Sequence, residues 1–276
     1  MRRTGGLESP VGLTPGDHTC WVYDDVRQFG ALAEEFLAEG VERHERVAYI
    51  GPAPREELAT QLTKLGDVNR LLAQGQLELF SSLDMYRDAA EIDPAAQVEV
   101  FRVKGLSALA DGYTGFRAAA DLTPLVDSPE RLATFARYEH LVDRLMATAR
   151  LTGLCGYDRS IIGEETARRI AALHPVAGGV EPGFHLFAFD DDAVGLAGEL
   201  DVDSHPDFAW ALRQLADLSG EVAVDASAVT FVDHRSLLEL DAVATECRLD
   251  LRLNGVSPVT RRVIDWLDLR RVSAAA

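Results

Sequence analysis

The sequence has few cysteines and no long hydrophobic run. Its three cysteines, Cys20, Cys155 and Cys247, are far apart and form no C-x-x-C pair. This usage is typical of a reducing cytoplasm rather than of a disulfide-rich secreted domain. No stretch approaches the roughly 18 consecutive apolar residues of a membrane-spanning helix. The two arginines near the N-terminus are not followed by the apolar segment of a signal peptide. We therefore expect a cytoplasmic protein.

Basic residues are also scarce relative to acidic ones. The chain holds 27 lysines and arginines against 45 aspartates and glutamates, which gives a formal net charge of −18. Both parts of the chain are acidic, since residues 185–276 alone hold 17 acidic and 8 basic residues. Such a surface repels phosphate backbones and anionic lipids, which argues against nucleic-acid or membrane binding. Proteins and small molecules remain as partners.

The turn after the apolar run at residues 47–50 lacks the features of a nucleotide-binding phosphate loop. The apolar run Val47–Ile50 is followed by the segment Gly51–Glu57, "GPAPREE". This segment has one glycine, two prolines without N–H donors, two carboxylates and no lysine, whereas a phosphate loop needs a glycine-rich turn with Lys and Ser/Thr. The sequence therefore argues against ATP hydrolysis at this position.

Motifs for nucleophilic or metal-assisted catalysis are missing as well. There is no G-x-S-x-G elbow, and Asp233, His234 and Ser236 resemble a catalytic triad only in composition, because neighbours in one turn point in different directions. His18 and Cys20 offer two ligands within three residues, but a zinc site usually needs four in recognisable pairs. A structural or cavity-lining role is favoured over metal or haem ligation. We expect no enzyme, no metal and no cofactor.

The clearest boundary in the chain is the segment "PVAGGVEPG", residues 175–183, whose three glycines and two prolines predict a linker. Before it, helical spacing over 26–41, 54–65 and 132–146 alternates with strand-like runs at 47–50, 77–80 and 151–157. Strands that alternate with helices predict a mainly parallel sheet covered on both faces.

After the linker, the pattern predicts the order β-β-α-β-α-β-α in about 90 residues, a usual size for one domain. The first two strands flank Asp190–Asp192, a predicted hairpin turn, and Ser204 is the predicted N-cap of a helix that runs to Leu218. Trp210 and Trp266 lie in amphipathic helices, which predicts core positions for both.

The segment from residue 185 onward resembles the STAS domain family, which includes the anti-anti-sigma factors (anti-sigma factor antagonists). The resemblance rests on "VGLAGELDVDS", on "GEVAVDASAVTFVDHRSLLEL" and on "LRLNGVSPVTRRVIDWLDL". It implies an α/β domain with a mixed sheet over residues 185–272. It also implies that the loop after "VTF" docks a partner, with Thr230, Asp233, His234, Arg235 and Ser236 as the contact residues.

This loop departs from the family pattern at the regulatory position. The family carries a phosphoserine directly after the aspartate, but here His234 follows Asp233, and Ser236 occupies the usual glycine position. A histidine is no substrate for a serine kinase, and the phosphate charge of about −1.5 to −2 is what drives the family's switch. We therefore expect a docking surface without the usual phosphoserine, and phosphorylation of Ser236 is the less favoured alternative.

Residues 11–177 resemble the MEDS family of sensory domains, found in a dichloromethane-responsive regulator and in many actinobacterial proteins. The segments that carry the resemblance are "GDHTCWVYDD", "RYEHLVDRLM", "GLCGYDRSIIGEE" and "ALHP". It implies a three-layer α/β/α fold of the RecA/KaiC type that has lost its phosphate-binding loop. The residues of these segments that we predict to line a ligand pocket or a signalling surface are His18, Cys20, Trp21, Tyr23, Tyr157, Asp158 and Arg159.

Together these resemblances predict a regulatory protein involved in signal transduction and transcription regulation. A sensory domain at 11–177 is joined by a linker at 178–184 to a docking domain at 185–272. The implied partner is a serine-kinase-type anti-sigma factor or a related regulatory protein, and the implied ligand is a small organic molecule. Two alternatives stay open: a degenerate RecA-like nucleotide-binding enzyme, and a scaffold without ligand. A homodimer formed through the N-terminal domain is compatible with either.

Overall fold

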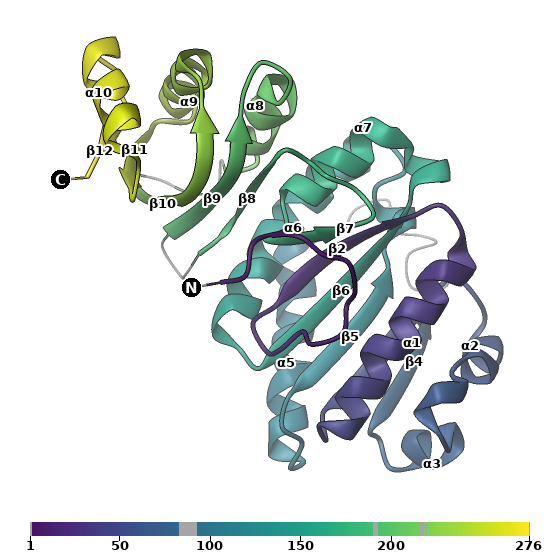
Figure 1. The fold of residues 1–276 in the computed structure, drawn as a ribbon. Helices are drawn as coiled ribbons and strands as arrows, with labels where there is room; N and C mark the ends of the chain where they lie inside the picture. Colours follow the sequence, from purple (N-terminus) through teal and green to yellow (C-terminus); the bar gives the residue numbers. More distant parts are fainter. Residues whose placement is uncertain (1, 83–92, 190–192, 216–217, 219, 276) are drawn as a thin grey trace.

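The computed structural model describes residues 2–82, 93–189, 193–215, 218 and 220–275. The predicted turn Asp190–Asp192 lies outside the described residues. Two β-sheets, each packed against helices, lie next to one another (Figure 1). The elements are β1 (Gly5–Gly6), β2 (His18–Tyr23), α1 (Val26–Glu42), β3 (Arg46–Gly51), α2 (Arg55–Gln61), the 3-10 helix η1 (Thr63–Leu65), α3 (Val68–Ala73), β4 (Leu77–Ser81), α5 (Pro94–Ala110), β5 (Phe116–Asp121), η2 (Thr123–Leu125), α6 (Pro129–Thr148), β6 (Leu151–Asp158), α7 (Arg159–Ala172), β7 (Val176–Gly178), β8 (Phe184–Ala188), β9 (Ala193–Leu200), α8 (His205–Arg213), β10 (Gly220–Val232), α9 (His234–Cys247), β11 (Leu249–Asn254), α10 (Pro258–Leu267) and β12 (Val272–Ala274).

The first sheet has seven strands in the order β1-β7-β2-β6-β5-β3-β4, and every pair in it is parallel. The prediction of a parallel sheet is confirmed. The predicted helix over 54–65 is shorter than expected, because the chain forms α2 only to Gln61 and then the 3-10 turn η1.

Helices cover both faces of this sheet, because successive side chains of a strand point to opposite faces. In β3, Val47 and Tyr49 pack in the core beneath α1, α2 and α3, whereas Ala48 and Ile50 pack in the core beneath α5, α6 and α7. All four side chains are buried. The first unit is therefore a three-layer α/β/α structure, as expected.

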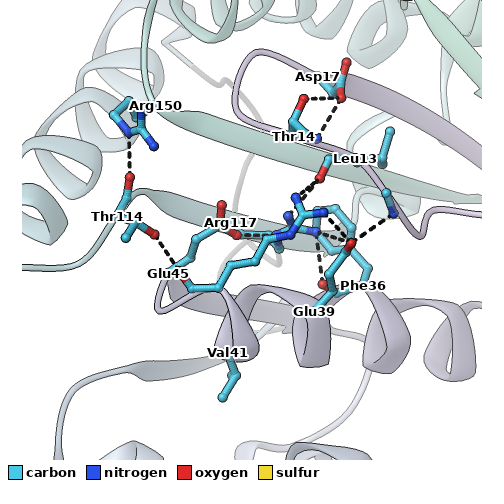
Figure 2. Close-up of polar contacts among 12 residues, drawn as sticks. Leu13, Thr14, Asp17, Phe36, Glu39, Val41, Glu45, Thr114, Arg117 and Arg150 are labelled. Atoms are coloured by element: carbon cyan, nitrogen blue, oxygen red, sulfur yellow. Dashed lines mark hydrogen bonds and ion pairs between the residues drawn. The ribbon is translucent and has the colours of Figure 1, made fainter.

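An arginine lies fully buried on the α1 side of the sheet. Arg117 in β5 donates from Nε to Glu45, 2.5 Å away, from Nη2 to the carbonyl of Leu13 at 2.9 Å and from Nη1 to Phe36 and Glu39, each at 3.2 Å. Figure 2 shows these acceptors converging on one guanidinium group. A buried cation is tolerated only when it is paired and hydrogen-bonded, and here the guanidinium meets both conditions.

The second sheet has five strands in the order β12-β11-β10-β9-β8. Its pairs are parallel except for the antiparallel pair β8–β9, so the predicted mixed sheet is confirmed. Helices α8, α9 and α10 lie on one side of it (Figure 1). Their apolar residues share one core with the sheet, which is centred on Phe208, Leu237 and Leu251.

Three local predictions in this unit need correction. Ser204 stands at the N-cap position of α8, but its hydroxyl donates to the carbonyl of Asp201 and makes no capping bond. The helix itself ends at Arg213. Trp266 is 81% exposed rather than part of the core, because α10 buries only Ile264 fully.

The segment predicted as a linker begins as a strand. Residues Val176–Gly178 form β7, which lies between β1 and β2 inside the first sheet. Gly179, with a φ of +75°, then turns the chain so closely past β2 that a Cβ atom there would lie 1.9 Å from the carbonyl oxygen of Val22. Only residues 179–183 connect the two sheets.

The two units share a packed boundary. Ala136 of α6 and Ala172 of α7 belong to the core of the second unit, and β8 contacts both helices. The chain near the N-terminus also lies against β8 (Figure 1). Within the described residues, none of the helices is both long and apolar enough to cross a membrane.

Candidate functional site

A cluster of histidine, cysteine and carboxylate side chains lies inside the first unit, beneath α6. His18 begins β2, Cys155 lies in β6, Glu139 lies in α6, and His174 lies between α7 and β7. One ligand atom from each of these residues lies within 4.8 Å of the others. All four residues are buried, the two histidines and Glu139 completely. Polar groups of this kind are rarely buried without a purpose, which makes the cluster the principal candidate site.

The imidazole of His18 is fixed by its neighbours. Its Nδ1 lies 3.2 Å from Asp143 of α6, and its Nε2 lies 3.3 Å from the sulfur of Cys155. Its partner in the β2–β6 register is Gly153, where a Cβ atom would lie 3.2 Å from the His18 ring. Because a carboxylate only accepts hydrogen bonds, Nδ1 donates to Asp143, and Nε2 faces the Cys155 sulfur and the Glu139 carboxylate.

Glu139 is at the centre of the cluster. Its Oε1 accepts a hydrogen bond of 2.8 Å from the hydroxyl of Tyr157. Its Oε2 lies 3.3 Å from Nε2 of His18 and 3.2 Å from Nε2 of His174. The Nδ1 atom of His174 donates to the carbonyl of Ile170 at 2.9 Å, so its Nε2 also faces Glu139. Two imidazole nitrogens therefore converge on one carboxylate oxygen.

The ionisation of the cluster reflects burial working against charge pairing. Burial and the neighbouring His174 lower the pKa of His18. Burial alone raises the pKa of a carboxyl, but His174 and His18 hold the pKa of Glu139 below its usual value. Although burial lowers the pKa of His174, the facing Glu139 carboxylate raises it overall. Glu139 is therefore an anion in a site that attracts positive charge.

The cluster is in contact with the second unit through Asp143. This fully buried carboxylate receives Arg2 at 2.7 and 2.8 Å and the backbone N–H of Ala188 in β8 at 2.8 Å. Burial alone raises the pKa of such a carboxyl, but His18 and Arg2 lower the pKa of Asp143 well below its usual range. His185 of β8 donates from Nδ1 to the carbonyl of His174 at 2.7 Å. The second unit therefore bonds directly to residues around the cluster.

The residues predicted as one pocket fall into two groups. His18, Cys20 and Tyr157 lie in the core beneath α6 or beside the cluster, while Trp21 and Tyr23 point to the α1 face, because side chains alternate along β2.

Asp158 and Arg159 lie at the far end of β6, at the carboxyl edge of the sheet. Asp158 caps α7 by accepting from Ser160 N, and Arg159 pairs with Asp24 at 3.1 Å. At the same edge, Tyr23 donates to Asp121 at 3.2 Å. Tyr23, Asp158 and Arg159 therefore lie apart from the buried cluster.

The turn between β2 and α1 joins a parallel strand inside the first sheet to a long helix. It consists of Asp24 and Asp25, and Asp25 caps α1 by accepting from the N–H of Arg27 at 2.9 Å. A phosphate bound there would meet two carboxylates where a phosphate loop offers glycine amides and a lysine. The turn after β3, with one glycine, two prolines and no lysine, is no better suited to bind a phosphate.

The predicted docking loop caps α9. Asp233 is the N-cap, accepting from Ser236 N at 2.7 Å, and Thr230, His234 and Arg235 are exposed. The Ser236 hydroxyl is buried between the carbonyl of Leu200 and Nε2 of His205.

The contacts of His205 do not form a catalytic triad. Asp233 approaches the same Nε2 atom of His205, at 3.2 Å, that already lies 2.8 Å from the Ser236 hydroxyl. In a relay the carboxylate would hold the other ring nitrogen.

The three thiols differ in burial, although burial raises the pKa of all three. Cys20 and Cys155 are buried, and burial raises the pKa of each well above its usual value. Cys247 is partly exposed. Because the thiolate is the reactive form, we expect a chromogenic disulfide reagent at pH 8 to modify one thiol quickly and the other two only after unfolding. Cys247→Ser should remove the fast phase, and a fast phase of two or three thiols would contradict this assignment.

Sequence reasoning missed Glu139, Asp143, Cys155 and His174 as site residues. A signal was present, since the four segments "GDHTCWVYDD", "RYEHLVDRLM", "GLCGYDRSIIGEE" and "ALHP" each contribute to the cluster. Glu139 and Asp143 are also four residues apart, which places both on one side of a helix.

Comparisons with known proteins agree with part of this picture. A family model described as MEDS, "MEthanogen/methylotroph, DcmR Sensory domain", matches residues 17–175, which is more than half of the chain. None of the curated proteins matches. Among solved structures, the chain is similar to the crystal structure of flagellar accessory protein FlaH from Methanocaldococcus jannaschii, with 15% sequence identity and a TM-score of 0.39. That similarity covers 64% of this chain and 75% of the other.

Proposed function

The chain belongs to the MEDS family of sensory domains, and from this premise we propose that it is a regulatory protein in which the first unit senses a signal and the second docks a partner protein. The observation that carries the proposal is the set of bonds between the buried cluster and β8. Asp143 holds His18 of the cluster and Ala188 of the second unit at once. A ligand that alters the cluster therefore alters a contact between the two units.

A second set of contacts leads from the first unit to the docking loop. Arg168 and Arg169 of α7 both pair with Asp207 of α8, at 2.9 Å each. Two residues earlier, His205 at the start of α8 contacts Asp233 and Ser236. Helix α7 ends two residues before His174, so movement of that histidine can reach the loop through α7 and α8. Such a route transmits a signal only if it has two arrangements that the ligand distinguishes.

The second unit is proposed to be a STAS-like docking domain. Its mixed sheet, with helices on one side, and the capped loop before α9 support this reading. The exposed side chains of His234 and Arg235 carry no negative charge, so they can meet an acidic or neutral surface of a partner. The proposed partner is a serine-kinase-type anti-sigma factor, held without a phosphoserine switch, because His234 replaces the serine and Ser236 is buried.

We propose binding rather than catalysis for the whole chain. The two strand-to-helix turns considered for phosphate, at residues 24–25 and 51–54, hold carboxylates or prolines. The Ser-His-Asp contacts in the second unit lack a relay geometry. These observations support a sensor over the alternative of a degenerate nucleotide-binding enzyme.

Exposed residues of the docking loop provide the test. We expect His234→Ala/Arg235→Ala to abolish the recovery of a serine-kinase-type anti-sigma factor in an affinity pull-down from the native lysate, because both side chains lie at the loop surface. The matched control is Glu246→Ala on the same helix, whose surface pair with Arg213 contributes at most about 1 kcal/mol.

Circular dichroism and thermal unfolding should show that both variants fold as the unmodified chain does. Equal recovery with all three proteins, or recovery of no such factor, would contradict the docking role.

A further inference from the structure

The buried cluster has the geometry of a metal site. In a tetrahedral zinc site with nitrogen, oxygen and sulfur ligands, neighbouring ligand atoms lie ~3.3–3.6 Å apart. Here Nε2 of His18 lies 3.3 Å from the Cys155 sulfur and 3.3 Å from Oε2 of Glu139, which lies 3.2 Å from Nε2 of His174. Three edges of the tetrahedron are therefore already at the required length.

The free lone pairs point to the same place. Both histidines donate from Nδ1, His18 to the Asp143 carboxylate and His174 to a backbone carbonyl, so both Nε2 atoms face the cluster and can bind a cation in the neutral form of the ring. Oε2 of Glu139 is an acceptor too, and apart from their 3.2 Å approach to each other and the 3.3 Å approach of Oε2 to His18, neither it nor Nε2 of His174 has a hydrogen-bond partner among the described residues, although both are fully buried. Two imidazole nitrogens and a carboxylate oxygen that face one another can hold a cation in place of the proton between Glu139 and His174.

The surroundings match those of protein-bound metals. Metal-binding histidines usually donate their other nitrogen to a carboxylate or a carbonyl, which fixes the ring, and both histidines here do so. Tyr157 holds the second oxygen of Glu139 in the same way. The Asp143 carboxylate is neutralised separately by Arg2. The orientation of the cluster is thus set by partners outside it.

The charges also balance. A dication bound by the Glu139 carboxylate and the Cys155 thiolate, with two neutral imidazoles, gives a site of zero net charge. This balance lowers the cost of burying ionised groups. Binding requires Cys155 to release its thiol proton to solvent, together with any proton held between Glu139 and His174.

We propose that His18, Glu139, Cys155 and His174 bind one divalent transition-metal ion of the zinc class. Within the residues that the structure describes, this is the one cluster with ligand atoms close enough to do so. The mixed nitrogen, sulfur and oxygen set favours Zn²⁺, Co²⁺ or Fe²⁺ over Mg²⁺ or Ca²⁺, which prefer oxygen. The inference concerns the same cluster as the proposed sensory role but does not depend on partner docking.

The first test measures metal bound to the full-length chain. Protein freed of metal with a chelator and then given Zn²⁺ should retain one ion per chain after gel filtration, measured by plasma mass spectrometry. The same protein given Co²⁺ should develop a near-ultraviolet thiolate-to-cobalt band and the strong visible bands of four-coordinate cobalt. Retention of no ion, or a cobalt spectrum without the thiolate band, would overturn the proposal and leave the cluster as a His174–Glu139 ion pair.

Variants locate the ion. Cys155→Ser should remove the thiolate band and weaken Zn²⁺ binding more than 100-fold, whereas Cys247→Ser, a matched control at a thiol outside the cluster, should change neither. Asp143→Asn, which changes a residue that supports His18 but is not itself a ligand, should weaken binding about 10- to 100-fold. Unchanged binding in Cys155→Ser would overturn the proposed ligand set.

The unmodified chain allows a check that needs no variant. The midpoint of thermal unfolding should rise with Zn²⁺ and return when chelator is added, because an ion that binds only the folded state stabilises it. These readouts are independent of the pull-down. Zinc binding without capture of a partner would contradict the docking role alone, and capture without zinc binding would contradict the metal site alone.

Discussion

Asp143→Ala is expected to lower the free energy of unfolding by about 3–5 kcal/mol, as is usual when one partner of a buried ion pair is removed. The variant leaves Nδ1 of His18 and the backbone N–H of Ala188 without an acceptor. It also leaves the guanidinium of Arg2 without its carboxylate partner, with only the carbonyls of Gly16 and Ala188 as acceptors. His18 belongs to the first unit and Ala188 to the second, so the loss of the Asp143 carboxylate should also loosen the boundary between the two units. Urea unfolding at equilibrium measures the first effect, and hydrogen exchange at the Ala188 amide measures the second.

Two comparisons make this prediction specific. Asp250→Ala removes an exposed carboxylate that pairs with Arg271, and it should cost at most about 1 kcal/mol. Asp143→Asn keeps the shape and one acceptor oxygen, so it should fall between the two. A loss below about 1 kcal/mol in Asp143→Ala would mean that the boundary does not depend on this carboxylate.

Arg117→Met should be about as damaging, with a loss of about 3–5 kcal/mol, although methionine fills much of the same space. The guanidinium is fully buried, and its removal leaves Glu45 as an unpaired buried anion, while the carbonyl of Leu13 keeps only its bond from Arg43 (Figure 2). Glu39 is less affected, because Arg43 and the N–H of Gly12 still bond to it.

A double variant separates pairing from packing. Arg117→Met/Glu45→Met removes both charges and should recover most of the lost stability, since apolar replacements of a buried pair are often neutral or stabilising. Arg102→Met, which removes the exposed partner of Glu99, should cost at most about 1 kcal/mol. If the double variant is no more stable than Arg117→Met, the arginine contributes through its contact with the Phe36 ring rather than through its charge.

The strands rich in β-branched, aromatic or leucine residues could be predicted from the sequence, and a strand built from small residues could not. Strand β3 was predicted from its run Val47–Ile50. Strand β5 reads "FRAAAD", and alanine has little strand preference. Its position depends on neighbours, because Ala119 packs beneath α1 while Ala118 and Ala120 pack on the opposite face. That information lies in tertiary packing and not in the local sequence.

The same distinction holds for the candidate site. Alternation along a strand places His18 and Cys20 on one face and Trp21 and Tyr23 on the other, and this rule alone could have divided the predicted pocket. The approach of His174 to Glu139 could not be predicted, because it depends on α7 returning the chain to the edge of β2. A cluster assembled from four separate segments has no local spacing to recognise.

The short connection between the sheets has a thermodynamic consequence. Residues 179–183 can span at most about 17 Å when extended, so a broken boundary cannot carry the two units far apart. Their facing surfaces then meet at an effective concentration of the order of millimolar. A competitor for the surface around Ala188 must therefore bind strongly enough to displace the other unit of the same chain. A signal can then open the boundary between the units transiently more easily than it can separate them fully.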